Sequence, residues 1–226
     1  MSLFPCLGAV VAELETTFRR LDGPIDEKFD CGAPEQNNFL LKDAWEHQQR
    51  GYSVTHLAYV KGILAGYITL GNDVVDLTVD ERPESAPGAR ISAVKVFQFA
   101  VDKRFKRQGL GEEMLNLAVL YARENAATIA CRYLVLDSVT TKVEYYQKRG
   151  FVINETGRSK TIKQEKRADP QHPATVSMRF DLRDIGDIGA GLTLHRRKRQ
   201  SFGFRLVRAF RVRLGRLFAV LRASKR

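Results

Sequence analysis

The chain has 226 residues, of which 44% are hydrophobic and 28% charged, a composition typical of a folded globular domain. No apolar stretch reaches the roughly 18 residues of a membrane-spanning helix, and the three cysteines form no CxxC pair, so neither a transmembrane segment nor a zinc knuckle or disulfide framework is indicated. The net charge of +11 is uneven, because residues 196–226 carry 12 Lys and Arg and no acidic residue. We therefore expect a near-neutral domain over residues 1–185, a cationic tail over 186–226, and a cytoplasmic location with reduced thiols.

Periodicity and turn signals predict alternating strands and helices. Helical spacing of apolar residues marks helices, alternating or β-branched residues mark strands, and Gly and Pro mark their ends. In chain order these signals predict a strand at 17–21, a helix at 34–48, a hairpin of strands 54–59 and 63–70, a possible continuation at 74–79, a loop at 80–90, a strand at 94–101, a helix at 112–125, a strand at 133–136, a helix at 140–148, a strand at 151–153, a polar loop or flap at 159–173 and a strand at 175–180. That order predicts an α/β (α+β) domain, in which helices cover a sheet.

Residues 99–112 have the features of an anion site. A strand ends in a basic turn, which is followed by Gly109-Leu110-Gly111 and the start of a helix. The first amides of a helix have no backbone partner and carry partial positive charge, and glycines let phosphate oxygens approach closely. Four cations lie in this turn: Lys103, Arg104, Lys106 and Arg107. A pyrophosphate fits such a site, whereas Met114 in place of a third glycine and the lack of a Walker lysine argue against nicotinamide and NTPase sites.

A second motif follows on the later helix and supplies a phenol. It reads Tyr146-Gln147-Lys148-Arg149-Gly150-Phe151, and Tyr146 lies 35 residues after Gly111. A phenol has an ordinary pKa of about 10 and can donate a proton to a departing thiolate of similar basicity. The proton donor for a CoA-dependent transfer would need this property.

Together the two motifs resemble the GNAT superfamily of acyl-CoA-dependent N-acyltransferases. The family pattern is a strand, then (Arg/Gln)-x-x-Gly-x-(Gly/Ala), a helix, and later Tyr-x-x-x-Gly-Phe, and this chain has Lys106-Arg107-Gln108-Gly109-Leu110-Gly111 before Tyr146. The resemblance covers residues 16–181. It implies a central mixed, mostly antiparallel sheet flanked by helices, to which the chain adds its basic tail.

The resemblance implies an enzyme that transfers an acetyl group directly from acetyl-CoA, its co-substrate, to a primary amine, without a metal. The backbone of Phe99, Ala100 and Val101 would pair with the pantetheine arm and supply an oxyanion donor. Tyr146 would be the catalytic acid for the CoA sulfur. The residues implied to line the pyrophosphate site are Lys106, Arg107, Gln108, Gly109, Leu110, Gly111 and Glu112.

The remaining polar and titratable residues are weaker candidates for binding or catalysis. Lys106 replaces the family's Arg or Gln and lacks the fork geometry of Arg. His56 and Cys131 lie in or beside strands, where structural packing is expected. No general base is evident, and Asp137 at the end of its strand is a candidate for binding a water.

The acceptor amine is indicated by a narrower resemblance. Residues 29–32 (Phe-Asp-Cys-Gly), 37–40 (Asn-Asn-Phe-Leu) and 65–70 (Ala-Gly-Tyr-Ile-Thr-Leu) are similar to acetyltransferase toxins of toxin–antitoxin pairs. This implies aminoacyl-tRNA as acceptor and a DNA-binding antitoxin as partner. The alternatives are a GNAT that acetylates a small metabolite or a protein amine, and a non-catalytic nucleic-acid or membrane-binding module.

The tail bears on this choice. From residue 206 onward, apolar residues recur at helical spacing with arginines opposite, which predicts a basic amphipathic helix. Such a helix could bind tRNA phosphates, make peripheral contact with an anionic membrane, or dock on the domain or on a second copy in a homodimer. Twelve cations without an anion favour an anionic partner, with nucleic acid ahead of membrane.

Overall fold

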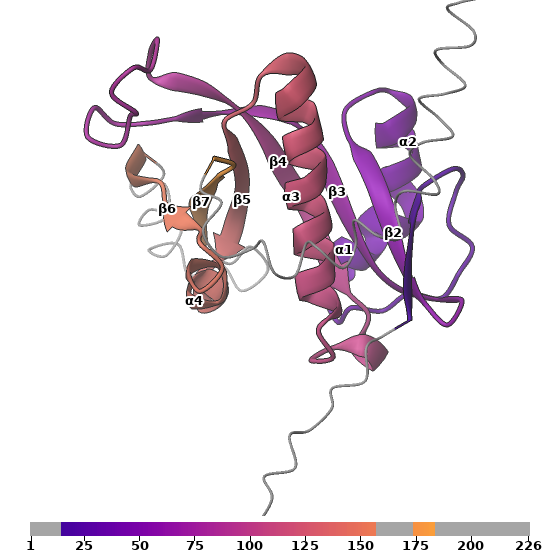
Figure 1. The fold of residues 1–226 in the computed structure, drawn as a ribbon. Coiled ribbons are helices and arrows are strands. Elements are labelled where there is room, and N and C mark those ends of the chain that lie inside the picture. The colour runs from indigo at the N-terminus through magenta and orange to yellow at the C-terminus, as the bar shows by residue number, and fades with distance from the viewer. Residues whose placement is uncertain (1–14, 157–173, 184–226) are drawn as a thin grey trace, which may run out of the picture. The chain divides into compact units, whose positions relative to one another are not determined.

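The computed structural model describes residues 15–156 and 174–183. The predicted flap at 159–173 and the predicted tail helix lie outside the described residues. The described part forms a seven-stranded sheet in the order β1-β2-β3-β4-β5-β7-β6 (Figure 1). Every neighbouring pair is antiparallel except β4 and β5, which run parallel. The sheet is therefore mixed and mostly antiparallel, as the resemblance implied.

The strands and helices follow the predicted order. The strands are β1 (Thr16–Arg20), β2 (Val54–Val60), β3 (Ile63–Asp76), β4 (Arg90–Val101), β5 (Tyr133–Val139), β6 (Val152–Ile153) and β7 (Thr175–Asp181). The helices are α1 (Pro34–Asn38), the π-helical η1 (Phe39–Asp43), α2 (Ala44–Gln49), the 3₁₀ turn η2 (Lys103–Phe105), α3 (Leu110–Ile129), the 3₁₀ turn η3 (Thr140–Lys142) and α4 (Val143–Gln147). Within the described residues, no helix combines the length and apolarity needed to cross a membrane.

Several elements differ from the sequence prediction in their ends or their helix type, and three of these differences have a structural cause. Strand β3 continues to Asp76, because its pairing with β4 runs from Gly66 to Asp76. The predicted helix 34–48 contains the π turn η1, for which the sequence gives no signal, since no Gly or Pro interrupts it. Helix α3 begins at Leu110, because Gly109 adopts φ +88° and its carbonyl accepts hydrogen bonds from the N–H groups of Glu112 and Glu113.

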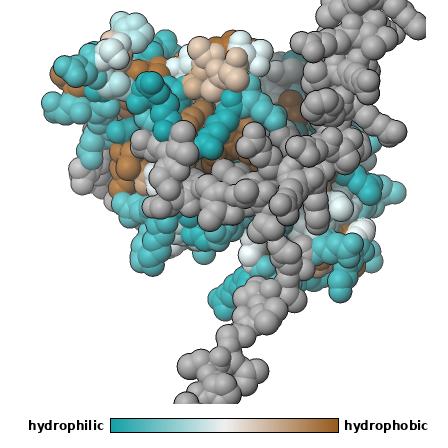
Figure 2. Space-filling model, viewed as in Figure 1, coloured by the Kyte–Doolittle hydropathy of each residue, from teal (hydrophilic) through white to brown (hydrophobic). Residues whose placement is uncertain are grey.

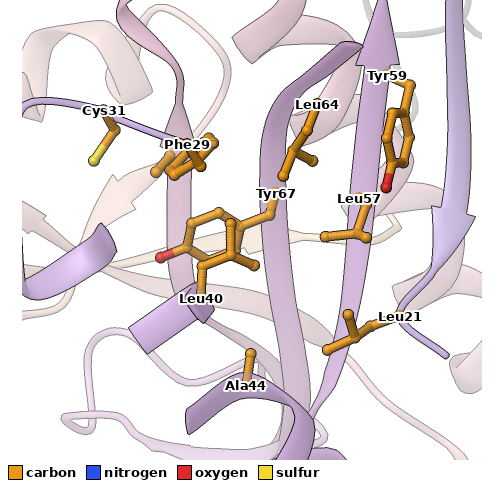
Figure 3. Packing of buried hydrophobic residues seen from close by; sticks show 10 residues of the cluster. Leu21, Phe29, Cys31, Leu40, Ala44, Leu57, Tyr59, Leu64 and Tyr67 are labelled. Atoms are coloured by element: carbon orange, nitrogen blue, oxygen red, sulfur yellow. The ribbon is translucent and has the colours of Figure 1, made fainter. Parts of the chain in front are cut away.

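Helices cover both faces of the sheet. On one face, α1, η1 and α2 pack on β2 and β3 through a buried cluster that includes Phe29, Leu40, Leu57 and Tyr67 (Figure 3). The Tyr67 hydroxyl, which would otherwise be a buried donor without a partner, bonds to the Gln36 carbonyl at 2.8 Å. These contacts fix the helical segment 34–49 against the sheet.

Helix α3 covers the other face, and in Figure 1 it crosses in front of the sheet. Gly66 precedes Tyr67 and faces the opposite side of β3, since successive strand residues alternate between faces. A Cβ on Gly66 would lie 2.7 Å from the Met114 sulfur, so only glycine lets α3 pack this closely. On the surface in view in Figure 2, hydrophilic residues of the described part surround smaller hydrophobic patches.

Strands β4 and β5 separate part of the way along their length. Their pairing runs only from Ala93↔Tyr133 to Val96↔Leu136. At the same point β4 contains an extra residue, Phe97, because Val96 pairs with Leu70 of β3 while Gln98 pairs with Thr69. Beyond this bulge, residues 97–101 have no strand partner on the β5 side within the described part of the chain. One edge of β4 is thereby left without a protein partner.

Candidate active site

The predicted cofactor strand and the predicted glycine turn meet on the α3 face of the sheet. A Cβ on Gly111 would lie 3.6 Å from the Phe99 ring and 3.8 Å from a Val101 methyl group. Ala100, between them, faces the opposite side and is buried in the cluster with Tyr67. The unpaired edge of β4 therefore runs directly toward the start of α3.

The start of α3 presents free amides. No side chain caps the helix, and the N–H groups of Leu110 and Gly111 have no acceptor among the described residues. Arg107 and Gly109 both adopt positive φ, +62° and +88°, which bends the turn before the helix. Unpaired amides at a helix start, together with the helix dipole, form a site that suits a phosphate.

Most of the cations predicted to surround the phosphate bond instead to the protein. The Lys103 ammonium lies 2.8 Å from Asp30 Oδ2, and the Lys106 ammonium donates to the Cys31 carbonyl at 2.7 Å. Arg104 pairs with Asp102 at 2.8 Å. Within the described residues, Arg107 is the member of this group whose exposed side chain has no bonded partner, and Gln108 donates to the Arg104 carbonyl. The side-chain charge left for a ligand is that of Arg107.

A residue that sequence reasoning missed, Asp102, organises this region. Its carboxylate is only 2% exposed and accepts hydrogen bonds from the N–H groups of Asp30 and Arg104 and from the Arg104 guanidinium. Burial alone would raise the pKa of Asp102, but these bonds outweigh it and hold the pKa below its usual value. The anchored segment is the Phe-Asp-Cys-Gly step at 29–32. The toxin-like motif therefore fastens the N-terminal segment to the phosphate turn.

A cavity of about 720 Å³ adjoins the same network. Its walls include the segment 25–30, Leu41 and residues 102–104. None of the residues that the sequence predicted for the cofactor lines it. The residues predicted to bind the cofactor therefore lie along the open β4 edge and at the start of α3, outside this cavity.

Two adjacent tyrosines lie on α4. The rings of Tyr145 and Tyr146 contact each other edge to face at 5.1 Å, and Tyr146 also packs against Phe151 at 5.7 Å. Burial, with a smaller effect of neighbouring Tyr145, raises the pKa of Tyr146 to about 12. Its phenol thus keeps its proton at neutral pH and can donate a hydrogen bond to a developing thiolate.

Tyr145, which the sequence did not single out, lies nearer the glycine turn. A Cβ on Gly111 would be 3.5 Å from the Tyr145 hydroxyl. The Arg149 guanidinium lies over the Tyr145 ring, 3.8 Å from its centroid, and donates to Glu112 Oε2 at 2.9 Å. Arg149 and Glu112 thus join α4 to the first turn of α3. The only sequence signal for this contact is that Arg149 lies inside the tyrosine motif.

The face covered by α1 and α2 has a polar cleft beside the point where β4 and β5 separate. Its volume is about 320 Å³, and its lining includes Asp73, Lys95, Asp137 and Ser177. The Lys95 ammonium lies 2.8 Å from Asp137 Oδ2 and 3.7 Å from Asp73 Oδ2. Asp137 therefore forms an ion pair with Lys95 and lies next to the point where β4 and β5 separate.

The other candidate side chains have structural surroundings. His56 stacks on Tyr121 of α3, with ring centroids 4.2 Å apart. Cys131 is half-buried, and burial raises the pKa of its thiol, which disfavours the reactive thiolate. Among residues 15–156 and 174–183, no group of three or more His, Cys, Asp or Glu side chains is arranged to hold a metal ion.

The chain is similar to known proteins in family and in fold. The family model described as "Acetyltransferase (GNAT) domain" matches residues 30–162. No curated protein matches the chain in sequence. A bacterial toxin of known structure superposes with a TM-score of 0.64 at 16% identity, covering 80% of this chain and 96% of that one.

Two further structures belong to the toxin AtaT. AtaT complexed with acetyl-methionyl-tRNAfMet gives a TM-score of 0.61 at 16% identity, covering 76% of this chain and 97% of AtaT. A variant of AtaT bound to acetyl-CoA and the C-terminus of the antitoxin AtaR gives 0.55 at 16% identity, covering 76% and 96%. At such identities these likenesses establish the fold. With a family match over more than half of its length, the chain belongs to the GNAT acetyltransferase family.

Proposed function

We propose that this protein transfers the acetyl group of acetyl-CoA to the amino group of an aminoacyl-tRNA. The observation that carries the proposal is the unpaired edge of β4, residues 97–101, which leads to the free amides of Leu110 and Gly111. An extended pantetheine arm carries amide groups that can pair with such an edge as an added strand would. Its diphosphate would then reach the start of α3.

In this arrangement the backbone of Phe99, Ala100 and Val101 binds the pantetheine. The turn from Lys106 to Glu112 binds the diphosphate mainly through backbone amides, because the Lys106 ammonium already bonds to Cys31. Among the described residues of this turn, Arg107 adds the side-chain charge that has no bonded partner. No metal takes part in the proposed reaction.

The proposed reaction is direct attack of the amine on the thioester. A backbone N–H of the free β4 edge donates to the carbonyl oxygen as negative charge develops there. Tyr146 donates to the CoA sulfur as the C–S bond breaks. Because the pKa of Tyr146 is raised to about 12, we expect it to stabilise the thiolate chiefly as a hydrogen-bond donor.

An RNA acceptor is supported by charge and by the structural likeness. Residues 196–226 carry 12 Lys and Arg and no acidic residue, and phosphates are the obvious partner for such a segment. AtaT, which shares the fold, has been solved with acetyl-methionyl-tRNAfMet and with its antitoxin. We therefore propose a catalytic domain over 1–185, an RNA-binding tail over 186–226, a toxin role with a DNA-binding antitoxin, and a cytoplasmic location.

A second candidate acceptor is a small cationic amine or a protein amine. The cleft beside the separated strands contains three carboxylates, Asp73, Asp76 and Asp137, against Lys95. This excess of negative charge favours an ammonium group and disfavours a phosphate close to the reaction centre. An aminoacyl-tRNA would have to place only its terminal amino acid in this cleft.

The test is transfer of labelled acetyl from acetyl-CoA to aminoacyl-tRNA, polyamines and protein in parallel reactions. We expect label in the aminoacyl ester fraction, and we expect Tyr146→Phe to lower the rate more than the matched variant Tyr145→Phe. A chain lacking residues 196–226 should lose tRNA affinity and its salt dependence. Label only in polyamines or protein would replace the proposed acceptor, and no label in any fraction would refute the proposed activity.

A further inference from the structure

Where β4 and β5 separate, a phenol lies on the side of one face of β5 and a carboxylate projects from the other face. Leu134 faces Phe180 of β7, whose ring packs on Phe151 at 5.5 Å, and Phe151 in turn contacts Tyr146. Asp137 is three residues beyond Leu134, so it faces the opposite side and pairs in register with Ser177. The phenol of Tyr146 and the carboxylate of Asp137 thus belong to opposite faces of the same strand.

Asp137 lies on β5 directly after the last residue that pairs with β4. The last residue of β5 that pairs with β4 is Leu136, so Asp137 is the first residue beyond the separation. Its side chain is 43% exposed at the cleft, and its Oδ2 forms an ion pair with the Lys95 ammonium at 2.8 Å. The other oxygen, Oδ1, has no partner within the described part of the chain. One carboxylate oxygen is therefore held and the other is available.

We infer that Asp137 is the base that removes the proton from the attacking amine, with Lys95 as a positioning residue. This inference rests on the proposed function, because a thioester bound along the open edge of β4 would lie between the two faces. The amine would approach from the Asp137 face. The sulfur would leave toward the Tyr146 face.

The proton transfers balance. The neutral amine forms the new C–N bond, and its nitrogen becomes positively charged and far more acidic. Asp137 Oδ1 accepts that proton, which leaves the amide product. The C–S bond breaks, and the sulfur of CoA receives a proton from Tyr146. Solvent then removes the proton from Asp137 and returns one to the Tyr146 phenolate, so that both groups are restored.

The surroundings of Asp137 leave its carboxylate accessible at the cleft. On β4 it faces Lys95, which also approaches Asp73 of β3 at 3.7 Å. On β7 the nearest charged side chain of the same face is Arg179, which is already paired with Glu81 at 2.7 Å. Within residues 15–156 and 174–183, Lys95 is therefore the cation that pairs with Asp137, and it leaves Oδ1 without a partner.

The experiment combines truncation of Asp137 with chemical rescue in the full-length chain. We expect Asp137→Ala to lower kcat by about 100-fold or more, the contribution of a general base, while acetyl-CoA affinity measured by calorimetry is unchanged. Added formate, which supplies a small carboxylate, should restore the rate about tenfold or more in a concentration-dependent manner. Asp137→Asn, which preserves shape, should be equally slow, and Glu46→Gln, an exposed carboxylate on α2, should behave as wild type.

The outcomes separate the two proposals. Transfer by the wild-type chain together with an unimpaired Asp137→Ala, or an impaired variant that formate does not rescue, would overturn the role of Asp137 alone. Failure of the wild-type chain to acetylate any amine would instead refute the proposed function. If Asp137→Ala does not fold, the rate of Asp137→Asn decides the matter, since a rate within about threefold of wild type is incompatible with a base.

Discussion

Asp102→Asn gives the sharpest test of how the phosphate turn is held. Oδ1 of Asp102 accepts the Arg104 N–H at 2.9 Å, and Oδ2 accepts the Asp30 N–H at 3.0 Å. Because both oxygens accept from backbone donors, the amide of Asn must point its NH₂ group at one of them, whichever way it is turned. One N–H then loses its acceptor at a site that is only 2% exposed.

The expected loss follows from these bonds. An orphaned buried N–H costs about 1–3 kcal/mol, and a hydrogen bond to a charged group contributes about 1.5–3 kcal/mol. We therefore expect Asp102→Asn to lower the free energy of unfolding by about 3 kcal/mol. In Asp30→Asn, Oδ1 can still accept from Gly32, and only the exposed pair with Lys103 is lost, so the cost should be far smaller than that of Asp102→Asn.

Urea denaturation of the two variants at pH 7 measures the difference. The pKa of Asp102 is held below its unfolded value, so its stabilisation is complete above about pH 4 and is lost as the pH falls through the lower folded value. The gap between wild type and Asp102→Asn should therefore narrow in acid. Equal losses in the two variants, or a gap that is independent of pH, would refute the argument.

Two further predictions concern other parts of the domain. Glu81→Ala should lower the free energy of unfolding, measured by urea denaturation, by about 3 kcal/mol, because it leaves the charged Arg179 without its partner in a pair whose side chains are 10% and 13% exposed. Asp76→Ala, which breaks an exposed pair, should lower it far less. Similar losses in the two variants would contradict this reasoning. Gly109→Ala should lower the free energy of unfolding by about 1–2 kcal/mol, because Gly109 has a φ of +88°, and should weaken acetyl-CoA binding measured by calorimetry. Gly88→Ala should have neither effect. Unchanged acetyl-CoA affinity in Gly109→Ala would argue against the α3 amides as the phosphate site.

The order of elements could be predicted because its signals are local. The alternation in β2 and β4 and the apolar spacing in α3 depend on neighbours a few residues away, so their existence was confirmed and only their ends moved. The glycine turn also carries its own geometry, since Gly109 supplies the left-handed conformation that starts α3. The two motifs were sufficient to indicate the family.

The partners of the charged side chains could not be predicted. Lys106 bonds to the carbonyl of Cys31, 75 residues away, and Lys103 pairs with Asp30. The sequence placed these cations beside a phosphate because they are adjacent to the glycine turn. Nothing local shows that the segment 29–32 folds back to engage them.

The sequence by itself determined the order of strands and helices, the glycine turn before α3 and the tyrosine helix, because each depends on backbone preferences and spacing within a short segment. The type of sheet was indicated by the family resemblance. Only the tertiary structure decided where β4 and β5 separate, which tyrosine approaches Gly111, and that Lys95 holds Asp137 at the opening. Those features depend on strand register and on loops that bring distant residues together. Small differences in register are decided by packing over the whole domain, and a linear pattern does not record them.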